Sequence, residues 1–218
     1  MVLEDKYRYE LVKLDTERGE ILCRYYSSNT HNSASVSVIY VTGIGGGWGT
    51  PALGLYPRLC GSLARMGIDG LRVRYRHPTD LLESVFDTLA GVAFLKEKHR
   101  TKAIGLVGHS FGGAVVIQAA VESSDIVSTI VTLATQSFGA AHEVSKLNQG
   151  TSALMIHGTD DKVLPVCCSE QVYQKAHEPK QIVLCEGAGH GLDEVSEEVY
   201  ELVYGWLVNN LFLSRDTS

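Results

Sequence analysis

Short apolar segments alternate with longer segments of helical periodicity along most of the chain. Five of the predicted strands are nearly uninterrupted apolar runs, and such strands need no polar side when helices cover both faces of a parallel sheet. The alternation therefore predicts an α/β fold with a mostly parallel central sheet and helices on both faces. The predicted strands cover residues 35–41, 70–76, 102–108, 125–135, 151–158 and 180–186.

The first 34 residues depart from this alternation. Residues 7–14 and 20–28 flank the turn-like sequence DTERG, and this pattern predicts a hairpin that adds antiparallel strands at one edge of the sheet. No internal repeat or Pro/Ser-rich linker divides the chain. We therefore predict a single domain over residues 1–218, with the edge hairpin within residues 1–34 and a disordered tail at residues 214–218.

Composition narrows the class of function. The net charge is −6, and no block of lysine and arginine forms the basic surface that binds nucleic acid. No apolar run approaches the ~18 residues of a membrane span, and the N-terminus lacks the hydrophobic region of a signal peptide. We expect a cytoplasmic protein that has no nucleic acid partner and no integral membrane association. Its five cysteines are interpreted as buried, reduced thiols.

The sequence GHSFG follows the strand predicted at residues 102–108 and places Ser110 at a strand-to-helix turn. A nucleophilic serine at such a turn has a strained backbone, and glycine at positions 108 and 112 removes the collision that larger side chains would make. The motif alone fits a helix N-cap equally well. A nucleophile also needs a histidine to accept its proton and an acid to orient that histidine.

Acidic residues and a histidine follow two later strands. Asp160 and Asp161 come after the strand at residues 151–158, and His190 comes after the strand at residues 180–186. Because the carboxyl ends of parallel strands meet at one edge of a sheet, the fold would bring these loops to Ser110. The joint pattern favours a catalytic triad over a solvated turn and a loop histidine. Neighbouring side chains point apart, so only one of the two aspartates can face His190.

A glycine-rich loop, TGIGGGWG, follows the first strand of the predicted parallel sheet. Such a loop can turn a backbone N–H toward an acyl oxyanion, and we assign this role to Ile44 together with the N–H of Phe111. The rival interpretation is the dinucleotide fingerprint G-x-G-x-x-G. It is disfavoured because Trp48 stands where the third glycine should be and because the next strand ends in arginines instead of an acidic residue.

Four segments resemble motifs of the α/β-hydrolase family. GHSFGG is similar to its nucleophile elbow, VTGIGGGWG to its oxyanion loop, HGTDDKVLP to its acid loop and EGAGHGL to its histidine loop. The resemblance runs from about residue 36 to residue 213 and is greatest to the compact dienelactone-hydrolase-like and carboxylesterase-like members. It implies that the catalytic acid is Asp161, four residues after the HG histidine, with Asp160 as the second choice.

Two departures from the family pattern bear on the site. Thr42 stands where many members have histidine, which affects the shape of the oxyanion loop but not its backbone donors. Only residues 136–150 connect two of the predicted strands at a place where lidded members insert tens of residues. We therefore expect no sizeable cap domain.

The resemblance implies a serine hydrolase that cleaves carboxylic esters or thioesters through an acyl-enzyme, with no cofactor and no metal. Its substrate would be a small molecule or an acyl-bearing partner. Trp48, Phe138 and His142 are candidate substrate-binding residues because their loops follow strands at the active edge, whereas His157 is interpreted as a structural histidine. The alternatives are a catalytically silent ligand-binding or scaffold protein, or a lyase or acyltransferase that uses the same site. Oligomeric state is not fixed by the sequence.

Overall fold

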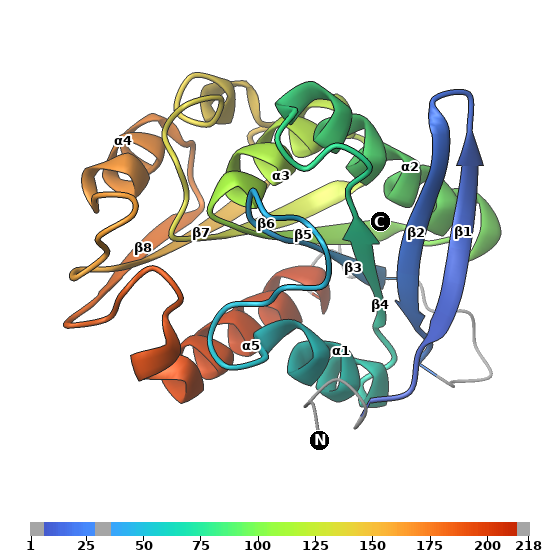
Figure 1. Cartoon of the computed structure of the whole chain (residues 1–218), viewed down its shortest axis with the longest axis horizontal. Helices are drawn as coiled ribbons and strands as arrows, with labels where there is room; N and C mark the ends of the chain where they lie inside the picture. The colour runs from blue at the N-terminus through green and yellow to red at the C-terminus, as the bar shows by residue number, and fades with distance from the viewer. Residues whose placement is uncertain (1–6, 29–35, 213–218) are drawn as a thin grey trace.

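The computed structural model describes residues 7–28 and 36–212. Within these residues one eight-stranded sheet has the order β1-β2-β4-β3-β5-β6-β7-β8 (Figure 1). Strands β3 to β8 are parallel to one another, and β2 joins β4 in antiparallel pairing, which confirms the predicted fold class. The strands are β1 (Glu10–Thr16), β2 (Gly19–Tyr26), β3 (Val36–Val41), β4 (Asp69–Arg74), β5 (Ala103–His109), β6 (Val127–Leu133), β7 (Ser152–Gly158) and β8 (Lys180–Cys185).

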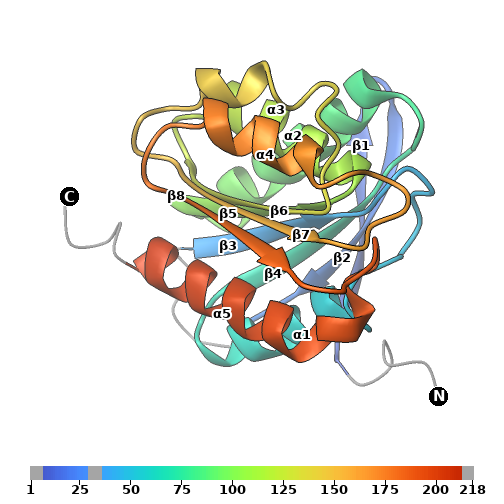
Figure 2. The same cartoon turned by 90° about the vertical axis from the view of Figure 1, so that its left-hand side faces the viewer.

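Helices cover both faces of the sheet. Helices α1 and α5 lie on one face, and α2, α3 and α4 lie on the other (Figures 1 and 2). Each helix presents apolar side chains to the sheet, whose inner strands are apolar on both faces. The helices are α1 (Leu55–Arg65), α2 (Leu81–Lys98), α3 (Phe111–Glu122), α4 (Cys167–Lys175) and α5 (Ser196–Phe212), with short 3-10 helices η2 (Glu143–Lys146) and η3 (Asp193–Val195). None of these described helices is long and apolar enough to cross a membrane.

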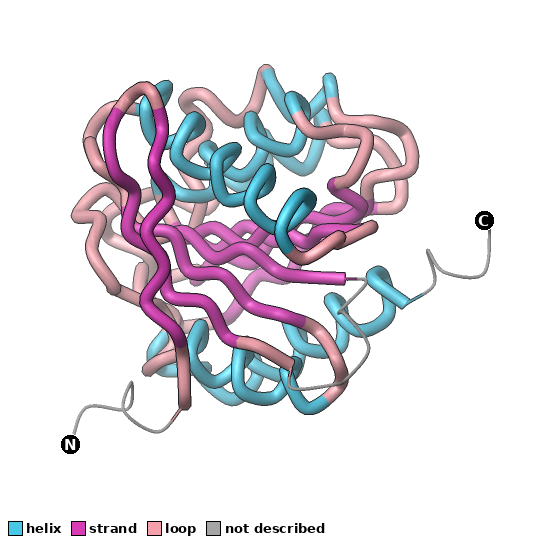
Figure 3. The backbone as a smooth tube through the Cα atoms, turned by 90° about the vertical axis from the view of Figure 1, so that its right-hand side faces the viewer, coloured by secondary structure: helices cyan, strands magenta, loops and turns pink. Residues whose placement is uncertain are grey.

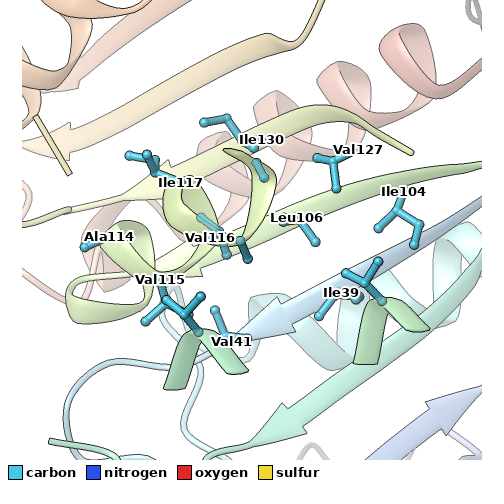
Figure 4. Close-up of a cluster of buried hydrophobic side chains, with 14 of the residues drawn as sticks. Ile39, Val41, Ile104, Leu106, Ala114, Val115, Val116, Ile117, Val127 and Ile130 are labelled. Carbon is cyan, nitrogen blue, oxygen red and sulfur yellow. The ribbon is translucent and has the colours of Figure 1, made fainter. Parts of the chain in front are cut away.

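The inner strands are buried on both faces. Every residue of β3 and of β7 is buried, whereas β8, at the sheet edge, is mostly half-buried or exposed. On the α3 face, Ile39, Leu106 and Ile130 of the sheet pack with Val116 and Ile117 of the helix (Figure 4). Burying one such side chain contributes roughly 1.5–3 kcal/mol. The sheet is therefore a rigid base for the loops at its edge.

The N-terminal hairpin forms as predicted within the described residues. β1 and β2 pair from Glu10↔Tyr25 to Thr16↔Gly19, and Figure 3 shows this hairpin at one edge of the sheet. The strand β8 is at the opposite end of the strand order. Ile21, Cys23 and Tyr25 of β2 are buried in the core on the α2 face. Residues 1–6 and 29–35, and the predicted tail at residues 214–218, lie outside the described residues. The single-domain assignment stays a prediction.

The apolar periodicity of residues 51–67 predicts a helix over this segment, but α1 begins only at Leu55, four residues into it. Ala52 and Leu53 have φ of 49°, and Gly54 has φ of 97°, so the segment before Leu55 is a left-handed turn. Tertiary hydrogen bonds hold this turn, because the N–H of Ala52 donates to the Gly191 carbonyl at 2.7 Å. Local helical periodicity carries no information about that distant partner.

Two smaller expectations have different outcomes. Residues 134–151 connect β6 to β7 with only the short helix η2, as expected for a chain without a sizeable cap. All five cysteines are free, but Cys167 is exposed, so the expectation of buried thiols is wrong at that position. Cys167 is the first residue of α4, where its side chain faces solvent while that of Cys168 packs inward.

Candidate active site

Ser110 lies in a tight turn between β5 and α3. Its φ of 56° and ψ of −118° are unusual for a residue with a side chain, as expected for a strained elbow. A Cβ atom on Gly108 would lie 2.1 Å from the carbonyl oxygen of Gly112, and one on Gly113 would lie 2.1 Å from Thr135 Oγ1. Larger residues at these positions would push the strand and helix apart. Ser110 occupies the N-cap position of α3, but its side chain makes no capping hydrogen bond to the helix and is bonded to His190 instead.

A chain of hydrogen bonds joins three of the predicted residues. Ser110 Oγ lies 3.0 Å from His190 Nε2, and His190 Nδ1 lies 2.7 Å from Asp161 Oδ2. The carboxylate can only accept, so Nδ1 carries the hydrogen, and an unprotonated Nε2 accepts a hydrogen bond from the Ser110 hydroxyl. The three side chains lie on the segments that directly follow β5, β7 and β8.

Asp161 is buried and both of its carboxylate oxygens accept hydrogen bonds, whereas Asp160 is exposed. The N–H groups of Val163 and Leu164 donate to Asp161 Oδ1 at 2.8 and 2.9 Å, which leaves Oδ2 for His190. Burial disfavours the charge, but hydrogen bonds from Leu164, His190 and Val163 outweigh it and hold the pKa of Asp161 below its ordinary value. The acid is therefore ionised at neutral pH.

His109 supports the loop that carries His190. Its Nε2 lies 2.9 Å from the His190 carbonyl oxygen, and the two ring centroids are 4.8 Å apart. Burial lowers the pKa of His109 to about 4, partly offset by the hydrogen bond to that carbonyl. His109 is therefore neutral at pH 7, and its Nε2–H donates to the His190 carbonyl.

The glycine-rich loop after β3 runs beside the serine. A Cβ atom on Gly43 would lie 3.4 Å from Ser110 Cβ, and the N–H of Gly46 donates to the Gly43 carbonyl at 3.0 Å in a tight turn. Ile44 is 57% exposed, and Phe111 is the first residue of α3. A cavity of ≈ 280 Å³ separates this loop from the histidine loop, with Thr42, Pro51, His109, Gly191 and Asp193 among its lining residues.

The three candidate substrate-binding residues have different surroundings. Phe138 is 80% exposed on the β6–β7 connection, and His142 is exposed at the start of η2. The ring of Trp48 faces Arg24, whose guanidinium carbon is 4.2 Å from the ring centroid, and buried Arg72 donates to the Trp48 carbonyl. Trp48 is thus bound to the hairpin side of the sheet and does not line the described cavity.

Sequence reasoning missed two contacts around the predicted triad. His157 Nε2 lies 3.2 Å from Asp161 Oδ2, so the acid has a second histidine beside it. Asp193 Oδ1 accepts the N–H of Leu53 at 3.0 Å and joins the histidine loop to the turn before α1. The spacing HGxxD was a visible signal for the first contact, since it placed His157 and Asp161 at the same strand end. The second joins residues far apart in the chain and had no local signal.

Comparison with known families adds to this geometry. The model of the dienelactone hydrolase family matches residues 73–204, which is more than half of the chain and includes all three residues of the hydrogen-bonded chain. The chain belongs to this family. Membership of the dienelactone hydrolase family indicates a hydrolase. A search of curated proteins finds no match.

Solved structures share the fold at low sequence identity. Est1E from Butyrivibrio proteoclasticus is 17% identical with a TM-score of 0.77, and the alignment covers 92% of this chain and 98% of Est1E. Dienelactone hydrolase from Anabaena variabilis is 16% identical with a TM-score of 0.79, over 93% and 98% of the two chains. An α/β serine hydrolase without lid from Xanthomonas campestris is 15% identical with a TM-score of 0.73, over 93% and 94%.

Proposed function

We propose that this member of the dienelactone hydrolase family is a serine hydrolase that cleaves carboxylic esters or thioesters. The observation that carries the proposal is the hydrogen-bonded chain from Ser110 through His190 to Asp161. A serine hydroxyl is a weak nucleophile by itself, and this arrangement supplies both the base and the group that orients the base.

In the acylation step, Ser110 Oγ attacks the carbonyl carbon while its proton moves to His190 Nε2. The carbonyl electron pair moves to the oxygen, and the N–H groups of Phe111 and Ile44 are proposed to bind that oxyanion. Asp161 stabilises the imidazolium. The tetrahedral intermediate then collapses, its bond to the alcohol or thiol breaks, and protonated His190 donates its proton to the leaving group.

In the deacylation step, water takes the place of the leaving group. His190 accepts a proton from the water, whose oxygen attacks the acyl carbon, and the second intermediate releases the carboxylic acid and restores Ser110. His190 takes a proton first from Ser110 and then from water, and it returns these protons to the leaving group and to Ser110 Oγ. The residues of the triad therefore account for the whole cycle.

The short connection between β6 and β7 supports an open entrance to the site. An open entrance favours bulky or polar substrates over a deeply enclosed chain. Est1E has also been solved with ferulic acid bound, and a dienelactone hydrolase shares the fold, so aromatic acid esters and lactones belong in a substrate panel beside simple esters and thioesters.

A fluorophosphonate probe tests the proposed nucleophile. Wild-type protein should form a covalent adduct at Ser110 and hydrolyse short p-nitrophenyl esters, and Ser110→Ala should do neither. Equal labelling of Ser110→Ala would overturn the assignment. A wild-type protein that binds esters or lactones without turnover would instead favour the ligand-binding alternative.

A further inference from the structure

His157 is a buried polar side chain behind the triad acid. It lies near the end of β7, its side chain has 0% exposure, and Asp161 follows it four positions later in the chain. Its Nδ1 lies 2.7 Å from Ser169 Oγ of α4, and its Nε2 lies 3.0 Å from the Leu164 carbonyl oxygen. The proposed chemistry assigns it no role, yet it contacts both ends of the turn that holds the acid.

The neighbours of His157 fix its tautomer. Nε2 faces two acceptors, the Leu164 carbonyl at 3.0 Å and Asp161 Oδ2 at 3.2 Å. A lone pair at Nε2 would be repelled by both oxygens, so Nε2 carries the hydrogen. Nδ1 must then accept, and the hydroxyl of Ser169 is its donor. Ser169 thus holds His157 in the one neutral form that suits the turn.

The backbone of Leu164 links His157 to Asp161. Its carbonyl accepts from His157, and its N–H donates to Asp161 Oδ1 at 2.9 Å. Holding one end of this residue orients the N–H at the other end. The same His157 N–H lies close to Oδ2, where it favours the carboxylate orientation that faces His190.

We propose that His157 is a positioning residue, which, with Ser169, holds the Asp161–Leu164 turn so that Oδ2 of the acid stays aligned with His190. This inference rests on the proposed function, because alignment matters only if Asp161 orients a working base. Its consequence is kinetic. Misplacement of a catalytic group by about 1 Å can cost on the order of 10²-fold in rate.

Matched amide variants separate positioning from packing. The side-chain nitrogen of His157→Gln reaches the position of Nε2, whereas that of His157→Asn reaches only the position of Nδ1; His157→Leu has no donor. We expect His157→Gln to keep kcat within a few-fold of wild type. His157→Asn and His157→Leu should lower kcat by about 10- to 100-fold with little change in KM.

Thermal unfolding and active-site titration with the fluorophosphonate accompany each rate, so that only folded protein is counted. If His157→Asn and His157→Leu do not fold, Ser169→Ala decides. It removes the hydroxyl that donates to His157 Nδ1, so the His157 ring is no longer held in one tautomer. We expect kcat to fall by roughly three- to tenfold at unchanged KM. An unchanged kcat in Ser169→Ala, or rates that follow melting temperature with no rescue by His157→Gln, would overturn the proposal.

Failure of the two proposals gives different results. A wild-type protein that neither labels at Ser110 nor hydrolyses any ester or thioester overturns the proposed function, and the role of His157 with it. An active wild type beside an equally active, folded His157→Leu overturns only the role of His157.

Discussion

A Cβ atom on Gly112 would lie 2.4 Å from the carbonyl oxygen of Thr42, so the first turn of α3 touches the end of β3 through backbone alone. Gly43, the next residue, is close to Ser110. This one contact therefore sets the distance between the nucleophile elbow and the glycine-rich loop. The position and spacing of the proposed oxyanion donors depend on it.

Gly112→Ala should force this contact apart. Inserting a methyl group into a closely packed site costs about 1–3 kcal/mol in the free energy of unfolding, and kcat should fall as the loop moves. Urea unfolding and ester turnover measure the two effects. Gly45→Ala in the same loop is the matched control for stability, because a Cβ there meets nothing within 4 Å. Equal unfolding midpoints for the two variants would contradict the prediction.

The two neighbouring aspartates should differ sharply. Asp161→Asn replaces the acceptor of His190 Nδ1–H with an amide and favours the wrong tautomer, so kcat should fall by about 10⁴-fold. Asp160→Asn changes an exposed side chain and should leave kcat within a few-fold. Steady-state ester hydrolysis by both variants checks this. Comparable losses would show that the acid has been assigned to the wrong residue.

Stability should fall as the pH is lowered from 6.5 toward 4. Burial lowers the pKa of His109 to about 4 in the folded protein, whereas the unfolded chain has the ordinary value of 6.5. In this window the unfolded state binds more protons, so acidification favours unfolding. The loss is at most about 3 kcal/mol. Asp161, whose pKa is depressed, adds to the loss only below its ordinary value of 3.8.

Unfolding by urea at several pH values measures this dependence. His109→Phe keeps an aromatic ring but cannot be protonated, so its stability should vary less with pH between 6.5 and 4. A variant with the same slope as wild type in that window would show that other groups carry the dependence.

Two helical glycines should respond oppositely to alanine. Gly205 lies in the middle of α5, and a Cβ there meets nothing within 4 Å. Gly205→Ala should raise the free energy of unfolding by about 0.5–1 kcal/mol because alanine loses less backbone entropy on folding. Gly113→Ala in α3 should lower it, since its Cβ would lie 2.1 Å from Oγ1 and 2.5 Å from Cβ of buried Thr135. Thermal unfolding distinguishes the two.

The sequence predicted the features that depend on order along the chain. Apolar runs marked the strands, and parallel strands bring their following loops to one edge, so Ser110, His190 and one of the two aspartates could be expected together. The choice of Asp161 came from the resemblance to the α/β-hydrolase acid loop. Contacts that need a distant partner could not be predicted. The start of α1 is fixed by a hydrogen bond from Ala52 to Gly191, and no local pattern records it.

The surroundings of Trp48 show the same limit. Its position after β3 suggested the substrate pocket, but its ring faces Arg24. Arg24 comes from the N-terminal hairpin, whose place beside β4 is a matter of sheet order. Periodicity reveals which segments are strands and does not reveal which strands are neighbours.

His190 reaches Ser110 from a loop after β8, and among the described strands β8 lies at the edge of the sheet and pairs with β7 alone. A chain whose inner strands have already paired still carries a serine without its base until β8 docks. During refolding, reactivity toward a fluorophosphonate would therefore emerge only once β8 has docked. The same covalent label that tests the proposed nucleophile would then report the time at which this edge strand joins the sheet.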